Sequence, residues 1–243
     1  MTEATMGAVE GRGVDGGRGI GWWSDAWTLF MKNAGMWVVL SLLLIVIFIV
    51  LAVIPVLGSL AASLLMPVFI GSWLLAARKV DEGGSLEPGD LFTCFKEKLS
   101  PLLVLGALLL AAAIVIGVVV TMLGVGAFMG MMAGGGRHGG GAMMAGFGMG
   151  MFALLVGLVL GFIIAMAMWF APGLVVFRNM PPIDALKLSV SASLKNVVPF
   201  LLFGIIYFVL AIIASIPFGL GWFVLVPVLL LAGYVSYKDV FGV

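Results

Sequence analysis

The fold is decided by residues 34–54, which read AGMWVVLSLLLIVIFIVLAVI and contain no charged side chain. A helix needs about 20 apolar residues to cross the hydrocarbon core of a membrane. Five similar segments follow, at about 56–77, 101–123, 151–171, 197–216 and 220–235, and none of the six contains Asp, Glu, Lys, Arg or His. The sequence therefore predicts an all-α, polytopic transmembrane helical bundle with six spans arranged as three hairpins.

Composition supports the same class. Hydrophobic residues make up 63% of the 243 residues and charged residues only 9%, whereas a soluble domain carries about 25% charged residues. The short alternating segments of a membrane β-barrel are absent, and a helix satisfies its backbone hydrogen bonds within one segment. A water-soluble domain is excluded.

The distribution of basic residues predicts the orientation. Lys and Arg in short loops are retained on the cytoplasmic side of a membrane. With six spans, all of the twelve basic residues except Arg137 fall in the N-terminal segment, the second and fourth loops and the C-terminal segment. We therefore expect both ends of the chain in the cytoplasm.

The chain divides into a Gly-rich segment, residues 1–21, and a single transmembrane domain, residues 22–243. The first segment lacks the apolar region of a signal peptide, so we expect a disordered cytoplasmic tail. The middle hairpin carries an external tip, about 124–150, that is rich in Gly and Met. Runs of glycine are typical of flexible linkers.

Each hairpin is preceded by a short stretch with apolar residues at helical spacing, at 23–33, 90–99 and 182–196. Such stretches are typical of helices that lie in the membrane plane. The first and third hairpins also share a Pro–Gly turn and a later kink proline, Pro67 or Pro227. These recurrences predict three tandem units of a surface helix followed by a hairpin.

Most enzyme classes are disfavoured by the residues available. The only histidine, His138, lies in the external tip, no carboxylate lies within a span, and no phosphate-loop spacing occurs. The cytoplasmic loops are also too short for a catalytic domain, which needs more than about 50 residues. We expect no enzymatic activity, no cofactor and no nucleic-acid partner.

Two binding hypotheses remain open. Interrupted helices in corresponding repeats can mark a transport site, and Pro67 and Pro227 fit that pattern, although prolines also shape packing. Thioethers are suited to Cu(I), but the outer Met and His residues match no defined site. The weak Cu(I) candidates are Met129, Met131, Met132, His138, Met143, Met144, Met149 and Met151.

Small-residue and aromatic patterns give three further expectations. Gly-x-x-x-Gly steps at Gly126-Gly130-Gly134, Gly146-Gly150 and Gly157-Gly161 allow close helix contacts, either within one chain or between chains. Aromatic residues near span ends are typical of interfacial anchors. These are Trp22, Trp23, Trp37, Trp73, Trp169, Trp222, Tyr234 and Tyr237. Asp239 is expected to pair with a cytoplasmic cation.

The C-terminal stretch Tyr234-Val235-Ser236-Tyr237-Lys238-Asp239-Val240-Phe241, together with residues 26–30 and the turn at 54–58, resembles an uncharacterised family of proteobacterial multi-pass membrane proteins. The resemblance covers the chain from Trp22, except the Gly/Met-rich tip. The plan of the chain is more distantly similar to the membrane domains of glycerophosphodiester phosphodiesterases. The resemblance implies the bacterial inner membrane and no established activity.

The function predicted from the sequence is a non-enzymatic membrane accessory or scaffold. Its expected partners are membrane lipids, a second copy of the chain or another membrane protein. The alternative is a transporter or channel for a small neutral or lipidic solute, with Cu(I) handling as a less favoured form.

Overall fold

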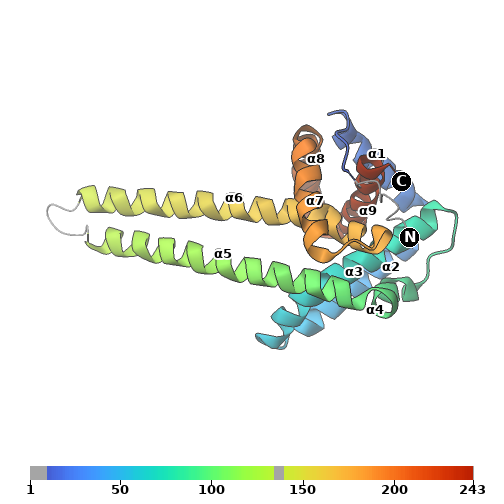
Figure 1. The fold of residues 1–243 in the computed structure, drawn as a ribbon, viewed down its shortest axis with the longest axis horizontal. Helices are drawn as coiled ribbons and strands as arrows, with labels where there is room; N and C mark the ends of the chain where they lie inside the picture. Colours follow the sequence, from blue (N-terminus) through green and yellow to red (C-terminus); the bar gives the residue numbers. More distant parts are fainter. Residues whose placement is uncertain (1–9, 134–139, 243) are drawn as a thin grey trace, which may run out of the picture. The chain divides into compact units, whose positions relative to one another are not determined.

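A computed structural model of the protein describes residues 10–133 and 140–242, and every regular element among them is a helix (Figure 1). Six helices are long and apolar enough to cross a membrane. They are α2 (Ala34–Ala52), α3 (Leu57–Asp81), α5 (Leu99–Ala133), α6 (Gly140–Arg178), α8 (Val197–Ser215) and α9 (Trp222–Phe241). The prediction of an all-α chain with six candidate spans is confirmed.

Short helices precede each pair of long ones. They are α1 (Arg18–Lys32), the 3-10 helix η1 (Pro88–Phe92) with α4 (Thr93–Glu97), and α7 (Pro182–Lys195). The order of elements therefore repeats three times, as the sequence pattern predicted. The second stretch was wrongly predicted as one helix, because the Asp90 carboxylate accepts the Glu87 N–H at 2.7 Å and fixes a tight turn first.

Three long helices continue past the predicted ends of their spans. Helix α3 runs to Asp81, α6 to Arg178 and α9 to Phe241, so each includes a basic residue in its last turn. Positive charge near a helix C-terminus is stabilised by the helix dipole. The charged residues are thus part of the helices and not of the loops that follow.

The chain forms two compact units, one of Met1–Gly106 with Met166–Val243 and one of Ala107–Ala165. In the first unit, α3, the end of α6 and α9 approach closely at glycines. A methyl group on Gly71 of α3 would lie 3.0 Å from Val176 of α6, and one on Gly173 of α6 would lie 2.9 Å from the Tyr237 ring of α9. These small residues let the three helices pack against one another.

Large aromatic residues fill the core of this unit. Trp22, Trp37, Trp73 and Tyr237 are at most 2% exposed, and the Trp37 and Trp73 ring centroids lie 5.1 Å apart. Trp23 is also buried, and its indole N–H donates to the Phe203 carbonyl at 3.1 Å. The prediction of interfacial anchors was therefore wrong for most of these residues, because their rings pack against other rings of the protein.

Residues 10–21 are ordered, in contrast to the predicted disordered tail, while residues 1–9 lie outside the described residues. The Arg12 N–H donates to the Val240 carbonyl at 3.0 Å, and α1 already begins at Arg18. A methyl group on Gly19 would lie only 2.0 Å from the Pro199 carbonyl oxygen. The glycines of this segment permit close packing. The prediction failed because a glycine-rich composition is also typical of disordered segments.

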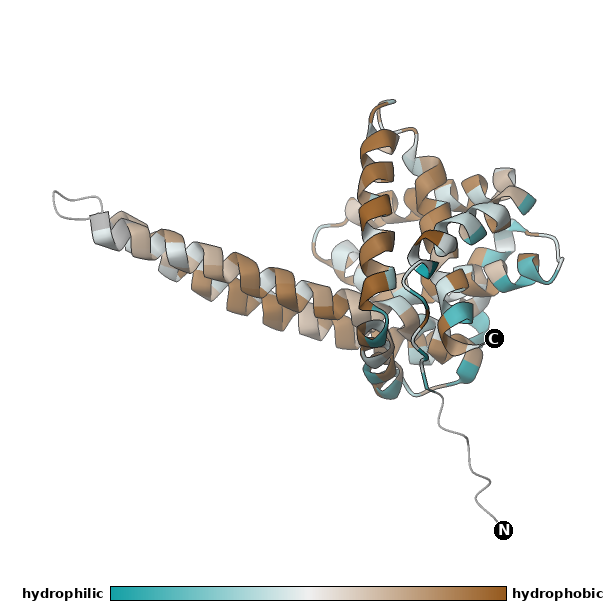
Figure 2. Cartoon of the chain, turned by 90° about the horizontal axis from the view of Figure 1, so that it is seen from above, coloured by the Kyte–Doolittle hydropathy of each residue, from teal (hydrophilic) through white to brown (hydrophobic). Residues whose placement is uncertain are grey.

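The second unit is a hairpin of the distal parts of α5 and α6. Gly126, Gly146, Gly150 and Gly157 each face a residue of the other helix, whereas nothing lies within 4 Å of a methyl group placed on Gly161. At these four positions the small-residue steps thus serve contacts within one chain, whereas Gly134 lies outside the described residues. Figure 2 shows predominantly apolar residues along this hairpin.

Candidate functional site: an ionic network and two pockets

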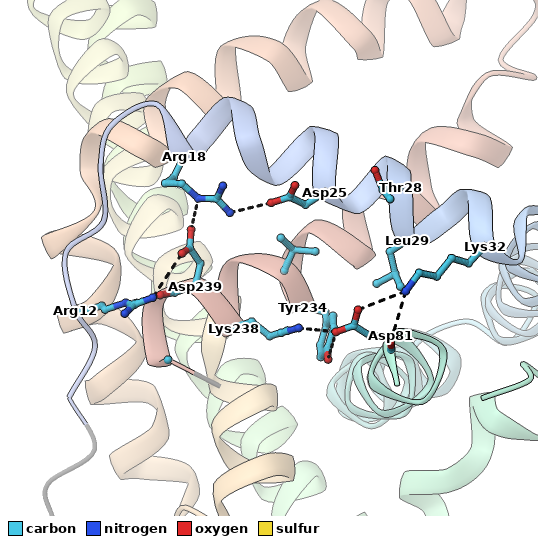
Figure 3. Close-up of a pocket in the computed structure, with 12 residues that line it drawn as sticks. Arg12, Arg18, Asp25, Thr28, Leu29, Lys32, Asp81, Tyr234, Lys238 and Asp239 are labelled. Carbon is cyan, nitrogen blue, oxygen red and sulfur yellow. Dashed lines mark hydrogen bonds and ion pairs between the residues drawn. The ribbon is translucent and has the colours of Figure 1, made fainter. Parts of the chain in front are cut away.

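Charged side chains of the first unit converge on two carboxylates, and we call this set the ionic network. Asp239 of α9 is the first. It accepts from the Arg18 Nε at 2.6 Å and from the Trp22 indole N–H at 3.0 Å, and Arg12 lies 3.7 Å away (Figure 3). The prediction that Asp239 pairs with a cation is confirmed. Its hydrogen bond raises the pKa of Arg18 above the ordinary value, so the guanidinium stays charged.

Asp81, the last residue of α3, is the second carboxylate. Lys238 of α9 donates to it, the Tyr234 hydroxyl donates to it at 3.2 Å, and Lys32 of α1 lies 3.7 Å away. These side chains come from three helices that are distant in sequence. The carboxylate is 29% exposed, and ion pairs with such access to water contribute only modestly to stability.

Asn196, between α7 and α8, attaches the N-terminal segment to the rest of the first unit. Its side chain is fully buried, accepts the Val14 N–H at 2.8 Å and donates to the Arg12 carbonyl at 2.9 Å. Lys195 adds a hydrogen bond to the Gly11 carbonyl at 3.1 Å. Because buried polar groups are normally satisfied by such partners, this contact fixes the backbone at Arg12 and Val14 against the start of α8.

The ionic network lines a pocket of about 560 Å³, which we call the ionic pocket. Figure 3 shows its charged side chains directed toward one another from α1, α3, α9 and the N-terminal segment. Four cations and three carboxylates line it: Arg12, Arg18, Lys32 and Lys238, with Asp25, Asp81 and Asp239. Each of these cations lies within 4.0 Å of a carboxylate, so the charges of this pocket are paired among themselves.

A second pocket of about 350 Å³, which we call the arginine pocket, lies beside the first. The two pockets share Asp81, Tyr234, Lys238 and Gly242. The ends of α3, α6 and α9 form its wall. Arg78 pairs with Glu82 at 2.8 Å and its guanidinium carbon lies 6.0 Å from the centre of the Phe177 ring. The pocket therefore combines cations with aromatic surfaces.

The Cu(I) hypothesis is not tested by the geometry. The described thioether side chains of the tip are exposed, from 41% at Met131 to 78% at Met144. His138 and the Met143 side chain lie outside what the structure describes. Among the described residues, no group of three or more His, Cys, Asp or Glu is placed to hold a metal ion.

The kink prolines lie in packed segments. Pro67 and its neighbour Val68 are buried in α3, and Pro227 and Val228 are buried in α9. Neither proline lines the ionic pocket or the arginine pocket. The two prolines are therefore not part of either charged pocket.

Most residues of the ionic network were not predicted. Asp81 and Lys238 were placed outside the spans, and Arg18 was assigned to a disordered tail. One signal was available, because α3, α6 and α9 all end in charged residues after a kink proline. Charges in corresponding positions of repeated hairpins indicate that the helix ends meet.

Comparison with known proteins gives one similarity of note. A Burkholderia thailandensis protein described as a probable inner membrane protein is 27% identical over 207 residues, which cover 82% of this chain and 75% of the relative. No family model matches the chain, and no solved structure matches it. The expected likeness to phosphodiesterase membrane domains and the C-terminal motif are not supported by these comparisons. Together with the six apolar helices, the similarity identifies the chain as a multi-pass membrane protein.

Proposed function

We propose that the chain is a non-enzymatic accessory or scaffold protein of the bacterial inner membrane. In this role it engages membrane lipids, another copy of itself or a partner membrane protein. The Lys and Arg distribution supports cytoplasmic ends. The basic residues Arg12, Arg18, Lys32 and Lys238 gather around one pocket, as expected if they lie on the same side of the membrane.

One observation carries the proposal: the segments around both kink prolines are packed with apolar side chains. Val68, next to Pro67, and Leu231, one turn after Pro227, are both 0% exposed. Ion-coupled carriers usually place ionisable residues within the membrane, whereas the charged residues of α3 and α9 lie in the last turns. A packed segment supports a structural role for the prolines.

A third pocket, of about 550 Å³, includes Val228 of α9 and is nearly all apolar. Its walls come from α1, α8 and α9, among them Trp27 and Leu210. Apolar walls favour contact with a lipid chain and disfavour a water-filled route. This pocket therefore supports engagement of lipid more than passage of a polar solute.

Thiol accessibility tests the proposal against transport. The variants Val68→Cys and Leu231→Cys each place a thiol beside one kink proline. Each protein, in its membrane, would be exposed to a charged, water-soluble thiol reagent. Lys96→Cys serves as the accessible control, because Lys96 is exposed on α4. The native Cys94 should react little, since burial raises the pKa of its thiol to about 11.

We expect modification of the control and none of Val68→Cys or Leu231→Cys. Modification of either buried probe at a rate close to that of the control would indicate a hydrated route beside the prolines. That result would replace the scaffold with a transporter or channel for a small solute.

Native mass spectrometry of the protein released from its own membrane then tests the positive part of the proposal. Masses that include lipid, a second copy or a partner chain are expected. A stoichiometric metal or small solute, with none of these, would contradict it.

A further inference from the structure

The arginine pocket has a cation that its own carboxylates do not neutralise. Three cations and two carboxylates line it, and each carboxylate is already paired, Asp81 with Lys238 and Glu82 with Arg78. Among the described residues, Arg178 has no carboxylate oxygen within 4.0 Å. The ionic pocket differs, because all four of its cations are paired. Each pocket is lined by one cation more than it has carboxylates, but only in the arginine pocket does one of these cations, Arg178, lie away from every described carboxylate.

A buried hydroxyl in the same pocket also has no partner. Tyr237 is 2% exposed, and its hydroxyl makes no hydrogen bond. Arg178 lies beside this hydroxyl, but their contact lacks hydrogen-bond geometry. A guanidinium supplies donors only, and a phenol can donate its own proton as well. Both side chains therefore present donors at the same end of the pocket, where one acceptor group can face them together.

The position of the pocket indicates the source of that acceptor. Its walls are the last turns of α3, α6 and α9, where three candidate spans end, and Phe177 and Tyr234 give it aromatic sides. Basic pockets between transmembrane helices, at the level where the spans end, bind anionic lipid headgroups. Guanidinium and phosphate form paired, charge-assisted hydrogen bonds.

We infer that the arginine pocket binds the phosphate of an anionic phospholipid headgroup, held by Arg178 and the Tyr237 hydroxyl. Lys238 and Arg78 contribute positive potential from the opposite walls. The inference rests on the proposed function, because it names a lipid ligand for a protein proposed to engage lipids. It also explains why a tyrosine hydroxyl is buried without a partner.

Lipid retention measures this binding. The purified full chain, stripped of lipid, would be titrated with phosphatidylglycerol or phosphatidylcholine and the bound lipid counted by native mass spectrometry. We compare the unmodified protein with Arg178→Gln, Arg178→Lys and Tyr237→Phe. Lys187→Gln is the matched control, because it removes one exposed cation from α7, which lines neither pocket.

We expect the unmodified protein to prefer phosphatidylglycerol, and Arg178→Gln to weaken that binding about tenfold. Arg178→Lys should restore part of it, because it keeps charge but loses the paired geometry. Tyr237→Phe should weaken it about threefold without changing phosphatidylcholine binding. Equal phosphatidylglycerol affinity for Arg178→Gln and Lys187→Gln would overturn the inference.

Soluble phosphate is the competing source of the same chemistry. Inorganic phosphate and glycerol phosphate would be titrated in the same assay. Weak or absent binding supports the lipid assignment, whereas affinity equal to that for phosphatidylglycerol overturns it. If lipid binding at the arginine pocket is disproved, the thiol-accessibility result still stands. The two experiments therefore test the lipid site and the scaffold role separately.

Discussion

Helices α3 and α9 of the first unit bury a much larger share of their side chains than the two helices of the second unit. In the first unit, Val68 and Leu231 are 0% exposed, while in the second, Leu158 is 61% and Met122 is 71% exposed. Half of the apolar window in α3 and in α9 is buried, against 11% in α5 and in α6. The two half-buried helices are also the least apolar, with mean hydropathies of 2.0 in α3 and 1.6 in α9 against 3.1 in α5 and 2.7 in α6. All of these helices are apolar enough to enter a membrane, and the lower values among them mark where protein packs against protein.

Polar side chains mark the difference. In the first unit, buried Ser72 accepts the Cys94 N–H at 3.0 Å, and buried Ser189 accepts the Phe170 N–H at 3.0 Å. The second unit has glycine contacts between two helices but contributes no side chain to the ionic network. A lipid-facing hairpin needs only its internal hydrogen bonds, whereas a packed unit also needs its loops and helix ends fixed.

The substitution expected to have the largest effect on the packed first unit is Gly19→Ala. The new methyl group would lie 2.0 Å from the Pro199 carbonyl oxygen and 3.1 Å from the Phe203 nitrogen. Because both contacts are backbone atoms, α1 must move away from α8. We expect a loss of about 3 kcal/mol, which corresponds to roughly 6–12 °C in the melting temperature in mild detergent.

Gly35→Ala provides the control, because nothing lies within 4 Å of its added methyl group. It should melt within about 2 °C of the unmodified protein. If Gly19→Ala has the same melting temperature as Gly35→Ala, the close packing of α1 on α8 is wrong.

Asn196→Ala has the next largest expected effect. The substitution removes hydrogen bonds to Val14, Arg12 and Ala192 from a fully buried position. Losing buried partners of this kind should cost about 2–3 kcal/mol and release the N-terminal segment. Limited proteolysis before α1 and thermal melting would both detect the change.

Ser63→Ala removes a hydrogen bond from an exposed serine of α3, whose hydroxyl donates to the Ser59 carbonyl at 2.8 Å. Its effect should be near zero, since this bond only supplements the helix. Proteolysis rates that are equal in the two variants would show that Asn196 does not hold the N-terminal segment.

Asp239→Asn tests the ionic network with a smaller effect. The carboxylate is 18% exposed, while its partners Arg18 and Arg12 are 38% and 61% exposed, so water screens the pairs. We expect a loss of about 1 kcal/mol that shrinks at high salt. Glu82→Gln, at an exposed pair at the C-terminal end of α3, should lose at most about 0.5 kcal/mol. A loss for Asp239→Asn that does not change with salt would argue against an ionic origin.

The fold was predictable because the signals for it were local. Six uncharged segments, three short amphipathic stretches and two Pro–Gly turns follow one another along the chain. All of them became the expected kind of element except the second amphipathic stretch, which forms a 3-10 helix followed by α4. Helix ends were less predictable. The last turns of α3, α6 and α9 contain charged residues that hydropathy assigns to loops, although the helix dipole favours basic residues there.

The candidate site was largely unpredictable because it depends on contacts between distant segments. The residues Arg12 and Asp239 are 227 positions apart and meet only after α1 packs on α8 and α9. The glycines of residues 11–19 had two meanings, flexibility or close approach, and composition cannot distinguish them. Pairing of Asp239 with a cation was predictable, since a carboxylate near a basic helix end tends to find a partner.

The smallest expected effect belongs to the second unit, at Gly117→Ala. Nothing lies within 4 Å of the added methyl group, and alanine favours a helix over glycine by up to about 1 kcal/mol. The melting temperature should stay unchanged or rise slightly. Its matched variant, Gly146→Ala, would place a methyl group 2.6 Å from the Ala127 carbonyl oxygen and should separate α5 from α6. If Gly117→Ala is as disruptive as Gly146→Ala, the exposed face of α5 contacts another protein surface, and lipid is not its only neighbour.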